Sequence, residues 1–387
     1  MDRISTFNPN RLRAARVYEG MSIAELSGLI GVSKQVISQY ENGKAKPSLE
    51  TLLKIMNVLN FPREYFYLPD RNNSRVGGAF FRSALTATKI TKDSQIEKLE
   101  SLTEAFTILD EYIDFPKLNI PVFEIEKLDL SEIELIAEQT RQYWGLGLEP
   151  INNIINLLER NGVIFSSFET TSHKIDAFSQ TQLVHDEERF FIILGSDKQS
   201  AVRRHFDAAH EIGHKILHSH IESIDDLTKE EYRDMERQAD YFAASFLLPR
   251  SKFLSDLVSP VNLNQFVELK KKWKVSIGAM VIRAYLLGAI NYNQYQYMMR
   301  QMSKNGWRTK EPLDDVLVVP DPTVLRKAVD LLLMNNVIKA KDILQRLGLP
   351  QNKAESILNL KKGSLVDKSA NEDKIIKLAV RQSIKSS

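Results

Sequence analysis

Two histidines four residues apart, with a glutamate beside the first, constrain this chain more than any other feature. They are His210 and His214, with Glu211 between them in the string His-Glu-Ile-Gly-His. Residues 202–217 contain no proline and a single glycine, which lies inside the string, so we expect this segment to be helical. Residues four apart lie on one face of a helix, where two imidazoles can bind one metal ion. The segment therefore predicts a helix that carries two metal ligands.

Glu211 predicts the chemistry of that site. A carboxylate next to the first ligand can reach a water molecule on the metal and take its proton as a general base. The chain has no cysteine, so a Zn²⁺ site must use nitrogen and oxygen ligands, and no disulfide framework is available. The string is typical of zinc peptidases, whose catalytic metal has three protein ligands and one position for water. A third ligand must therefore come from elsewhere.

Two histidines near the motif are weak candidates for this third ligand. His220 follows His214 by six residues, the spacing of metzincins, but Leu217 stands where those enzymes have the glycine that turns the chain back. His218 continues the same helix face, but it lies about 12 Å along the axis from His210, too far to share the ion. Neither histidine completes the site without a break in the helix.

Glu236 is the favoured third ligand. It lies in a second helical stretch, residues 235–244, where Asp240 shares its face. One carboxylate can ligate the metal while the other accepts the second ring N–H of a ligand histidine. Another acid, Asp240 included, stays open as the ligand. Two antiparallel helices with this set would form a gluzincin-like site.

These residues and their neighbours resemble the ImmA/IrrE family of metallopeptidases. The resemblance is strongest over residues 204–214, 236–244 and 246–249, and it extends to 176–179, 192–195, 198, 273–276 and 306–308. In the family's pattern the third ligand is the glutamate of Glu-x-x-Ala-[Asn/Asp], which falls on Glu236, and Asp240 is the last position. The resemblance implies a zinc protease that cleaves a partner repressor and so switches on genes of mobile elements or stress responses.

The first 68 residues predict a separate all-α domain. Helical patterns run over residues 10–19, 22–30, 33–41 and 48–60. Ser22, Ser33 and Ser48 are suitable N-caps, and Gly31 and Gly43 suit chain reversals after a helix. The second and third helices have the lengths and the short turn of a helix-turn-helix.

Residues 32–44 resemble the XRE family, the phage-repressor type of helix-turn-helix. The resemblance implies that Lys34, Gln35 and Gln39 lie on the exposed face of the recognition helix, where base edges are read. The candidate phosphate contacts are Asn42, Lys44 and Arg11. It also implies double-stranded DNA as a partner, and the reading of two half-sites would favour a homodimer. Some domains of this type bind proteins instead.

The fold class we expect is multidomain and mainly α. The regions are a helix-turn-helix domain at 1–68, a linker and connecting helix at 69–120, an α+β gluzincin-like metallopeptidase domain at 121–312, and a helical region with a disordered tail at 313–387. Residues 163–168 and 189–195 have the composition of strands, which predicts a small antiparallel sheet. Such a sheet can offer an edge to an extended peptide.

Three further side chains are candidate donors to the oxyanion of a cleavage reaction, or neighbours of the ligands: His218, Tyr241 and Arg204. The N-terminus leads to no apolar signal segment, and the apolar residues 279–290 contain Arg283 and are too short to span a bilayer. We therefore expect a cytoplasmic protein without a membrane partner. The net charge of +2 is too small to predict a polyanion partner by itself.

Two functions fit the sequence. In the first, the protein is a DNA-binding zinc metallopeptidase that regulates transcription by cleaving a repressor or another regulatory protein. In the second, it is a transcription regulator whose protease-like domain only senses a metal or ligand, or binds a partner. A domain that had lost catalysis would be free to lose Glu211, which is present and favours the protease.

Overall fold

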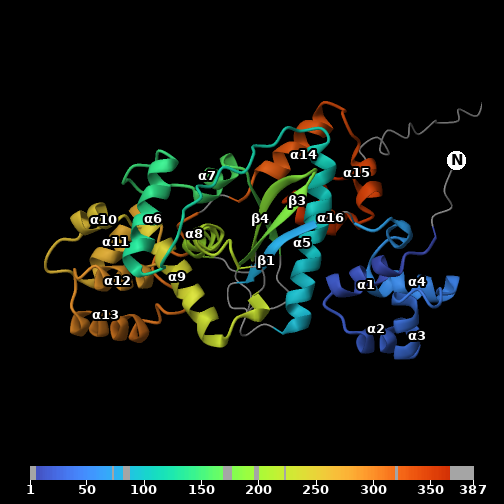
Figure 1. Ribbon diagram of the computed structural model, residues 1–387, viewed down its shortest axis with the longest axis horizontal. Helices are drawn as coiled ribbons and strands as arrows, with labels where there is room; N and C mark the ends of the chain where they lie inside the picture. Colours follow the sequence, from blue (N-terminus) through green and yellow to red (C-terminus); the bar gives the residue numbers. More distant parts are fainter. Residues whose placement is uncertain are drawn as a thin grey trace, which may run out of the picture.

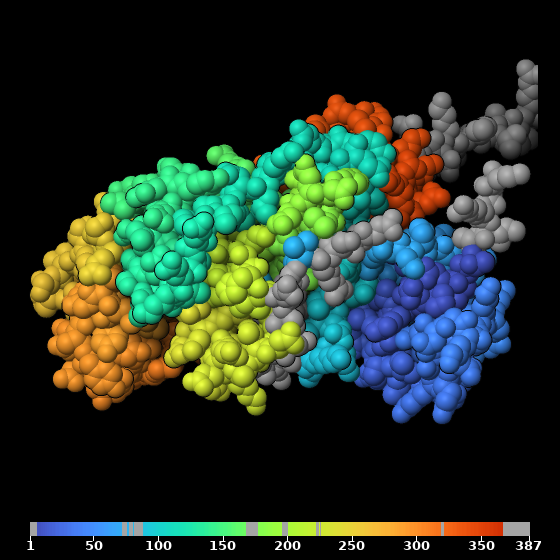
Figure 2. All heavy atoms as spheres, in the orientation of Figure 1, coloured from blue at the N-terminus to red at the C-terminus, as the bar shows by residue number. Residues whose placement is uncertain are grey.

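The computed structural model describes residues 6–71, 74–81, 88–168, 177–195, 200–221, 224–318 and 321–366. The N-terminal helices lie at one end of an elongated molecule, a sheet lies in the middle, and a group of helices forms the other end (Figure 1). The same order is visible on the surface, from blue through teal and yellow to orange (Figure 2). No helix in the described ranges has both the length and the apolar character needed to cross a bilayer.

The N-terminal domain contains α1 (Pro9–Tyr18), α2 (Ile23–Ile30), α3 (Lys34–Glu41), α4 (Leu49–Leu59) and the short η1 (Arg63–Tyr67). The predicted caps are confirmed, because Ser22, Ser33 and Ser48 each accept a backbone N–H from the first turn that follows. Gly31 ends α2 in the left-handed conformation, with φ of 73°. This turn sets α3 against α2 as a helix-turn-helix.

The sheet contains β1 (Ser74–Phe81), β2 (Val163–Phe168), β3 (Ala177–Val184) and β4 (Glu187–Gly195), in the order β1-β3-β4-β2. A two-residue hairpin turn joins β3 to β4, and both of its residues have positive φ, as type I′ turns require. The prediction of an antiparallel sheet is wrong for one pair, since β2 runs parallel to β4. The hairpin folds back so that β4, and not β3, lies beside β2.

The sheet separates two cores. One core joins the sheet to α5 (Lys89–Asp110), α14 (Val324–Met334), α15 (Ala340–Leu347) and α16 (Gln351–Ile357), and it continues past α5 into the N-terminal domain. The other core joins the sheet to α6 (Leu130–Tyr143), α7 (Ile154–Arg160), α8 (Ala201–Leu217) and α9 (Lys229–Leu247). The end of the molecule beyond α9 contains α10 (Arg250–Asp256), α11 (Leu263–Trp273), α12 (Ile277–Leu286) and α13 (Tyr292–Lys304). Apolar residues of β2, β3 and β4 point to alternate faces and so supply both cores.

The segments on both sides of the predicted peptidase domain take part in the sheet or cover it. Residues 69–120 are not only a linker and a helix, because β1 pairs with β3 at the edge of the sheet. The predicted helices after residue 313 pack on the sheet and on α5 (Figure 1). Asn359 binds the backbone of β2 at Phe165 and Ser167, and so covers the open edge of that strand. The predicted tail, from residue 367 on, lies outside the described residues.

Candidate metal centre

The candidate metal centre lies between α8 and α9, which cross closely at Gly213. A Cβ at this position would come within 3.1 Å of a ring carbon of Phe242 and within 3.3 Å of the carbonyl oxygen of Ala239. Glycine therefore permits an approach that a larger residue would prevent. This contact brings the face of α9 that carries Glu236 against the face of α8 that carries the two histidines.

Three ligand atoms meet at this crossing. The Nε2 atoms of His210 and His214 lie 2.9 Å apart, and the nearest oxygens of Glu236 lie 3.7 Å and 3.3 Å from them, respectively. The three residues form a group whose ligand atoms all lie within 4.8 Å of one another. Two imidazole nitrogens and one carboxylate oxygen fit the ligand preference of Zn²⁺. The geometry thus gathers Glu236, and not the exposed His220, with the two histidines.

The other ring nitrogens of the two histidines are also engaged. His210 Nδ1 lies 2.9 Å from Asp240 Oδ1. His214 Nδ1 lies 3.1 Å from His218 Nδ1, and His218 Nε2 lies 2.9 Å from Gln238 Oε1. If the Nε2 atoms bind a metal, both ligand imidazoles must carry their proton on Nδ1. His218 then accepts from His214 and donates to Gln238, so each ring has one consistent tautomer.

His218 is suited to this accepting role because it is neutral. Burial lowers its pKa to about 3, with a further contribution from the neighbouring His214. A neutral ring with its proton on Nε2 can accept at Nδ1, whereas a charged imidazolium cannot. The side chain lies on the Nδ1 side of His214, between this ring and Gln238.

A side chain of the sheet binds the carboxylate of Glu211. Ser179, on β3, donates its hydroxyl to Glu211 Oε2 at 2.5 Å. Glu211 and both histidines have no exposed surface. A ring from β1 completes the enclosure, because Phe80 stacks on His214 with ring centroids 4.9 Å apart and planes inclined by 13°. The water-activating group expected from the sequence is thus buried under two strands.

Two predicted oxyanion donors are engaged elsewhere. The hydroxyl of Tyr241 donates to Glu134, which also forms an ion pair with the buried Arg283. Arg204 pairs with Asp321 at 2.8 Å. The Tyr241 hydroxyl and one nitrogen of Arg204 thus have partners in the structure, and a part of either side chain in the reaction stays a prediction.

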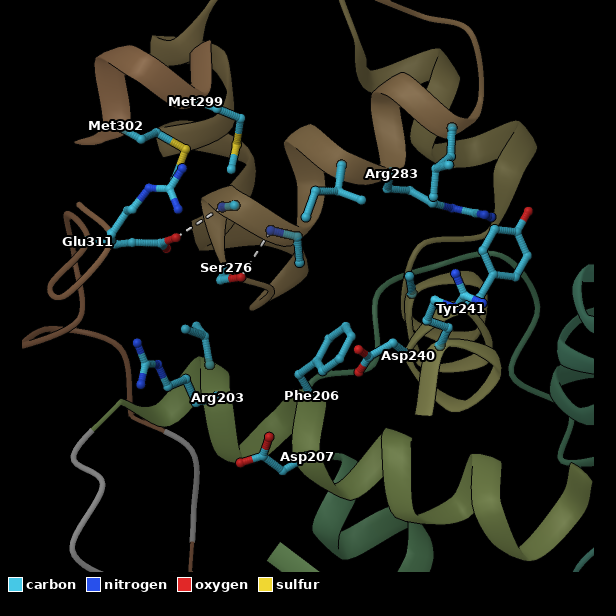
Figure 3. Close-up of a pocket in the computed structure, with 18 of the residues that line it drawn as sticks. Arg203, Phe206, Asp207, Asp240, Tyr241, Ser276, Arg283, Met299, Met302 and Glu311 are labelled. Carbon is cyan, nitrogen blue, oxygen red and sulfur yellow. Dashed lines mark hydrogen bonds between the residues drawn. The ribbon is translucent and has the colours of Figure 1, made fainter. Parts of the chain in front are cut away.

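A cavity of about 1040 Å³ lies beside the metal centre, between α8, α9, α12 and α13. Arg203, Phe206 and Asp207 line it from the face of α8 that continues toward the helix N-terminus from His210. Asp240 lines it from α9, so the partner of His210 is also a wall of the cavity (Figure 3). Apolar side chains cover the opposite side, namely Ile282, Leu286, Met299, Met302 and Trp307.

The recognition helix presents the side chains expected on it. Lys34, Gln35 and Gln39 are exposed on α3, and Asn42 and Lys44 are exposed just after it. The amide of Asn42 donates to the carbonyl oxygen of Ser38 and so caps the helix. The buried side of α3 is apolar, with Ile37 and Tyr40 in the domain core. All five side chains are therefore accessible to a partner.

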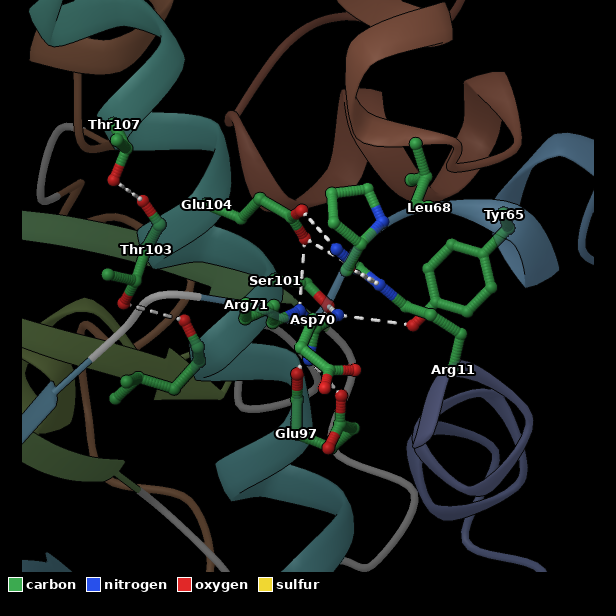
Figure 4. A network of polar contacts seen from close by, with 12 residues as sticks. Arg11, Tyr65, Leu68, Asp70, Arg71, Glu97, Ser101, Thr103, Glu104 and Thr107 are labelled. Carbon is green, nitrogen blue, oxygen red and sulfur yellow. Dashed lines mark hydrogen bonds and ion pairs between the residues drawn. The ribbon is translucent and has the colours of Figure 1, made fainter. Parts of the chain in front are cut away.

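Arg11 was expected to contact phosphate, and this prediction is wrong. Its side chain is only 3% exposed and forms two hydrogen bonds with Glu104 on α5, together with one to the carbonyl oxygen of Pro69 (Figure 4). Arg71 binds the same Glu104 and also Glu97. These buried ion pairs fasten the N-terminal domain to the long helix that covers the sheet.

Several residues of the site were not predicted. Ser179 lies in a stretch that carries the family resemblance, but its bond to Glu211 depends on the placement of β3 over α8. Phe80 reaches His214 only because β1 pairs with β3. Gln238 faces His218 from α9, a contact between helices that a single sequence does not reveal. Two other positions of the resemblance, Asp176 and Lys198, lie outside the described residues.

Comparison with known proteins identifies both regions. Residues 12–66 match the helix-turn-helix family, and residues 159–285 match the family described as the IrrE N-terminal-like domain. The chain is 34% identical over 55 residues to the SPbeta prophage-derived uncharacterized HTH-type transcriptional regulator YonR of Bacillus subtilis, a match that covers 14% of this chain and 51% of YonR. It is 32% identical over 72 residues to the HTH-type transcriptional regulator SutR of Escherichia coli, which covers 19% of this chain and 40% of SutR.

The matches span about half or less of the length of these curated relatives. The chain thus carries an XRE-type helix-turn-helix domain and an ImmA/IrrE-like metallopeptidase domain, as the motifs predict. The matched peptidase region begins in α7 and ends in α12. The strand β1, the helix α5 and the C-terminal helices lie outside it.

Proposed function

We propose that this protein is a DNA-binding zinc metalloendopeptidase that regulates transcription by cleaving a partner repressor or another regulatory protein. The observation that carries the proposal is that Glu236 on α9 lies against His210 and His214 on α8. The helix α8 also carries Glu211, next to the first of these histidines. The N-terminal domain and its similarity to transcriptional regulators support the regulatory part. We place this activity in the cytoplasm, where operator DNA and a repressor would both be accessible.

The residues of the site have distinct roles under this proposal. Zinc, when bound, lowers the pKa of a coordinated water and polarises the scissile carbonyl. Glu211 accepts the proton of the attacking water and passes it to the leaving amine. Ser179 holds one oxygen of this carboxylate, which fixes the direction of the other. Asp240 and His218 keep the two ligand imidazoles in the tautomer that carries its proton on Nδ1 and leaves Nε2 unprotonated for the metal.

Under this proposal the N-terminal domain binds operator DNA and so places the protein at the genes that it regulates. Lys34, Gln35 and Gln39 would read base edges in the major groove, and Asn42 and Lys44 would contact phosphates on either side. A homodimer would read two half-sites of an operator. The protease would then be concentrated at the DNA where the repressor that it cleaves is bound.

Zinc content per chain tests the metal centre. Wild type should contain close to one zinc per chain by elemental analysis, and Glu236→Ala should lose most of it. His220→Ala is the matched control, because this exposed histidine lies near the site but outside the ligand group. Zinc retained by Glu236→Ala, or absent from wild type after resupply, would contradict the proposal.

Glu211→Gln separates catalysis from metal binding. The amide keeps the shape of the side chain but cannot accept a proton, so zinc content should stay and cleavage should fall at least a hundredfold. The substrate can be found by comparing the proteins that disappear when wild type, but not Glu211→Gln, is expressed. Unchanged regulation of target genes by Glu211→Gln would favour a function without cleavage.

The cavity beside the metal centre favours one second candidate function. Its volume of about 1040 Å³ suits a small molecule, and Asp240 joins its wall to the ligand His210. In this alternative the domain senses a ligand or metal and transmits the change to the N-terminal domain. Regulation that persists in Glu211→Gln but is lost when Ile282→Trp fills the cavity would support it.

A further inference from the structure

The metal centre cannot accept a polypeptide in the arrangement that the structure shows. His210, Glu211 and His214 have no exposed surface, and Glu236 is the sole ligand with part of its side chain, 19%, exposed. A scissile carbonyl must approach both the metal and Glu211 to within about 3 Å. Some element must therefore move before a substrate can bind.

The strand β1 is the element that covers the site. It runs antiparallel to β3 along the edge that faces α8, with Phe80 opposite Ser179 and Val76 opposite Thr181. Ser179 holds Glu211, and the ring of Phe80 stacks on His214. Phe80 also lines a cavity of about 740 Å³ and so separates that space from the ligand histidine. An extended backbone therefore already lies over the catalytic residues.

An extended peptide is also what a protease of this kind would bind there. Substrates commonly add to an exposed strand edge through backbone hydrogen bonds. The opposite edge of this sheet, at β2, is covered by Asn359 and by the bond from Ser166 to the carbonyl oxygen of Ile357. Among the described strands, the edge of β3 is thus the edge beside the metal centre, and β1 occupies it.

Two features mark β1 as the part that can leave. It lies outside residues 159–285, the region matched to the peptidase family, whereas β3 lies inside that region. Its pairing is also interrupted, because three residues of β1, positions 77–79, stand opposite one residue of β3 between the Val76 and Phe80 pairs. Two of the three are glycines, which weaken a strand. The ladder that holds β1 is therefore discontinuous over the catalytic residues.

We propose that β1 is an internal pseudosubstrate: it occupies the substrate-binding edge of β3, and an extended segment of the partner protein must displace it before cleavage. This inference rests on the proposed peptidase function. It adds that the occupant of the edge is a segment of this same chain, placed between the DNA-binding domain and the peptidase domain. Displacement of β1 is then a step at which the activity can be controlled.

A reversible disulfide tests this directly. The chain has no cysteine, so Val76→Cys with Thr181→Cys creates a single bond between β1 and β3. Paired residues in an antiparallel ladder have Cα atoms about 4.5–5.5 Å apart, which a disulfide can span. The matched control is Val184→Cys with Glu187→Cys, which links β3 to β4 and leaves β1 free. A phosphine reductant is used to open each disulfide, because thiol reductants bind zinc themselves.

Two measurements on the zinc-loaded protein decide the outcome. One is the rate at which a chromogenic chelator extracts zinc, and the other is the rate of cleavage of unfolded casein. Oxidation of the β1–β3 pair should slow both at least tenfold, reduction should restore them, and the β3–β4 pair should show no such dependence. Equal rates for the oxidised and reduced β1–β3 pair would overturn the inference while the peptidase function stands.

The two readouts also separate this inference from the proposed function. If oxidation of the β1–β3 pair slows zinc extraction but no polypeptide is cleaved, then β1 covers the metal centre and the peptidase function is contradicted. Phe80→Ala provides a second variant, because loss of the stacked ring should speed zinc extraction severalfold in a chain that keeps its wild-type far-UV spectrum. Tyr292→Ala, which removes an exposed aromatic ring from α13, should leave the rate unchanged.

Discussion

Helix α8, which carries two of the three candidate metal ligands, and the recognition helix α3 use polar side chains in opposite ways. On α8, His210, Glu211 and His214 are completely buried, and each lies against a polar side chain from another element, namely Asp240, Ser179 and Glu236. On α3, Lys34 and Gln35 are exposed. The buried set is pre-organised for one geometry, whereas the exposed set can adapt to the groove that it meets.

This difference teaches where a substitution should be felt. Around α8 the truncation of one buried side chain leaves other buried polar groups without a partner, so stability and metal affinity should fall together. On α3 a change should alter binding and leave the fold intact. The predictions that follow test this contrast.

The largest effect on stability should come from the polar cluster that supports α9. Arg283 is fully buried and forms a bidentate pair with Glu134, which also accepts from Tyr241 and Ser245. Glu134→Ala leaves the guanidinium buried without its counter-charge, so we expect the free energy of unfolding to fall by about 3–5 kcal/mol. Chemical denaturation measures the change.

The matched control for this variant is Glu50→Ala on α4, which removes an exposed i,i+4 partner of Lys54. It should leave the denaturation midpoint at the wild-type value. Equal losses in the two variants would show that the buried ion pair contributes no more to the free energy of unfolding than the exposed one. The contrast between buried and exposed polar side chains would then fail.

The next effect concerns the crossing of α8 and α9. Gly213→Ala adds a Cβ within 3.1 Å of Phe242, so the helices must separate, at a cost of about 1–3 kcal/mol. Zinc affinity should fall with stability, since Glu236 lies on the helix that moves. Gly28→Ala is the control on α2, where an added Cβ meets nothing within 4 Å. That change should stabilise by about 0.4–1 kcal/mol, and a loss in both variants would contradict this account.

These two predictions show what the sequence could provide and what it could not. The spacing of His210 and His214 fixes their shared face because a helix decides it locally, and the cap residues of the N-terminal domain are equally local. The choice of Glu236 over His220 followed from Leu217, which stands where a turning glycine is needed, and from the second helical stretch, and the geometry agrees with it. The role of Ser179 depends on a contact with Glu211, 32 residues away, and the pairing of β1 with β3 joins residues about one hundred positions apart, which no short pattern records.

Arg11 illustrates the same limit from the other side. Its position in the first helix suits a phosphate contact, and nothing in the neighbouring sequence contradicts it. Its actual partner, Glu104, lies 93 residues away on α5. Arg11 is thus a buried anchor between the N-terminal domain and α5.

The pH dependence of stability should report another buried group of α8. His205 is fully buried, and burial lowers its pKa to about 3, with a smaller contribution from Lys274. The unfolded chain binds this proton below pH 6.5, whereas the folded chain does not, so stability is complete above pH 6.5 and falls as the pH decreases toward 3. The loss should be about 1.4 kcal/mol for each pH unit.

Thermal unfolding of wild type and His205→Leu between pH 7.5 and 4 measures this contribution. The variant should show a flatter dependence of Tm on pH, and substitution of the exposed His220 by leucine should leave the wild-type slope. An unchanged slope in His205→Leu would show that other groups control acid unfolding.

The smallest effect on stability, with a clear effect on binding, should come from α3. Lys34→Ala and Gln35→Ala remove exposed side chains, so the free energy of unfolding should change by less than about 0.5 kcal/mol. Each should weaken binding to the preferred operator by about 1–3 kcal/mol, because a good contact with a base edge discriminates by that amount. The operator can be selected from a random duplex pool with the full-length protein, and fluorescence anisotropy then gives the affinities. If both variants bind that operator as tightly as wild type, then α3 does not read DNA, and its exposed face serves a protein partner instead.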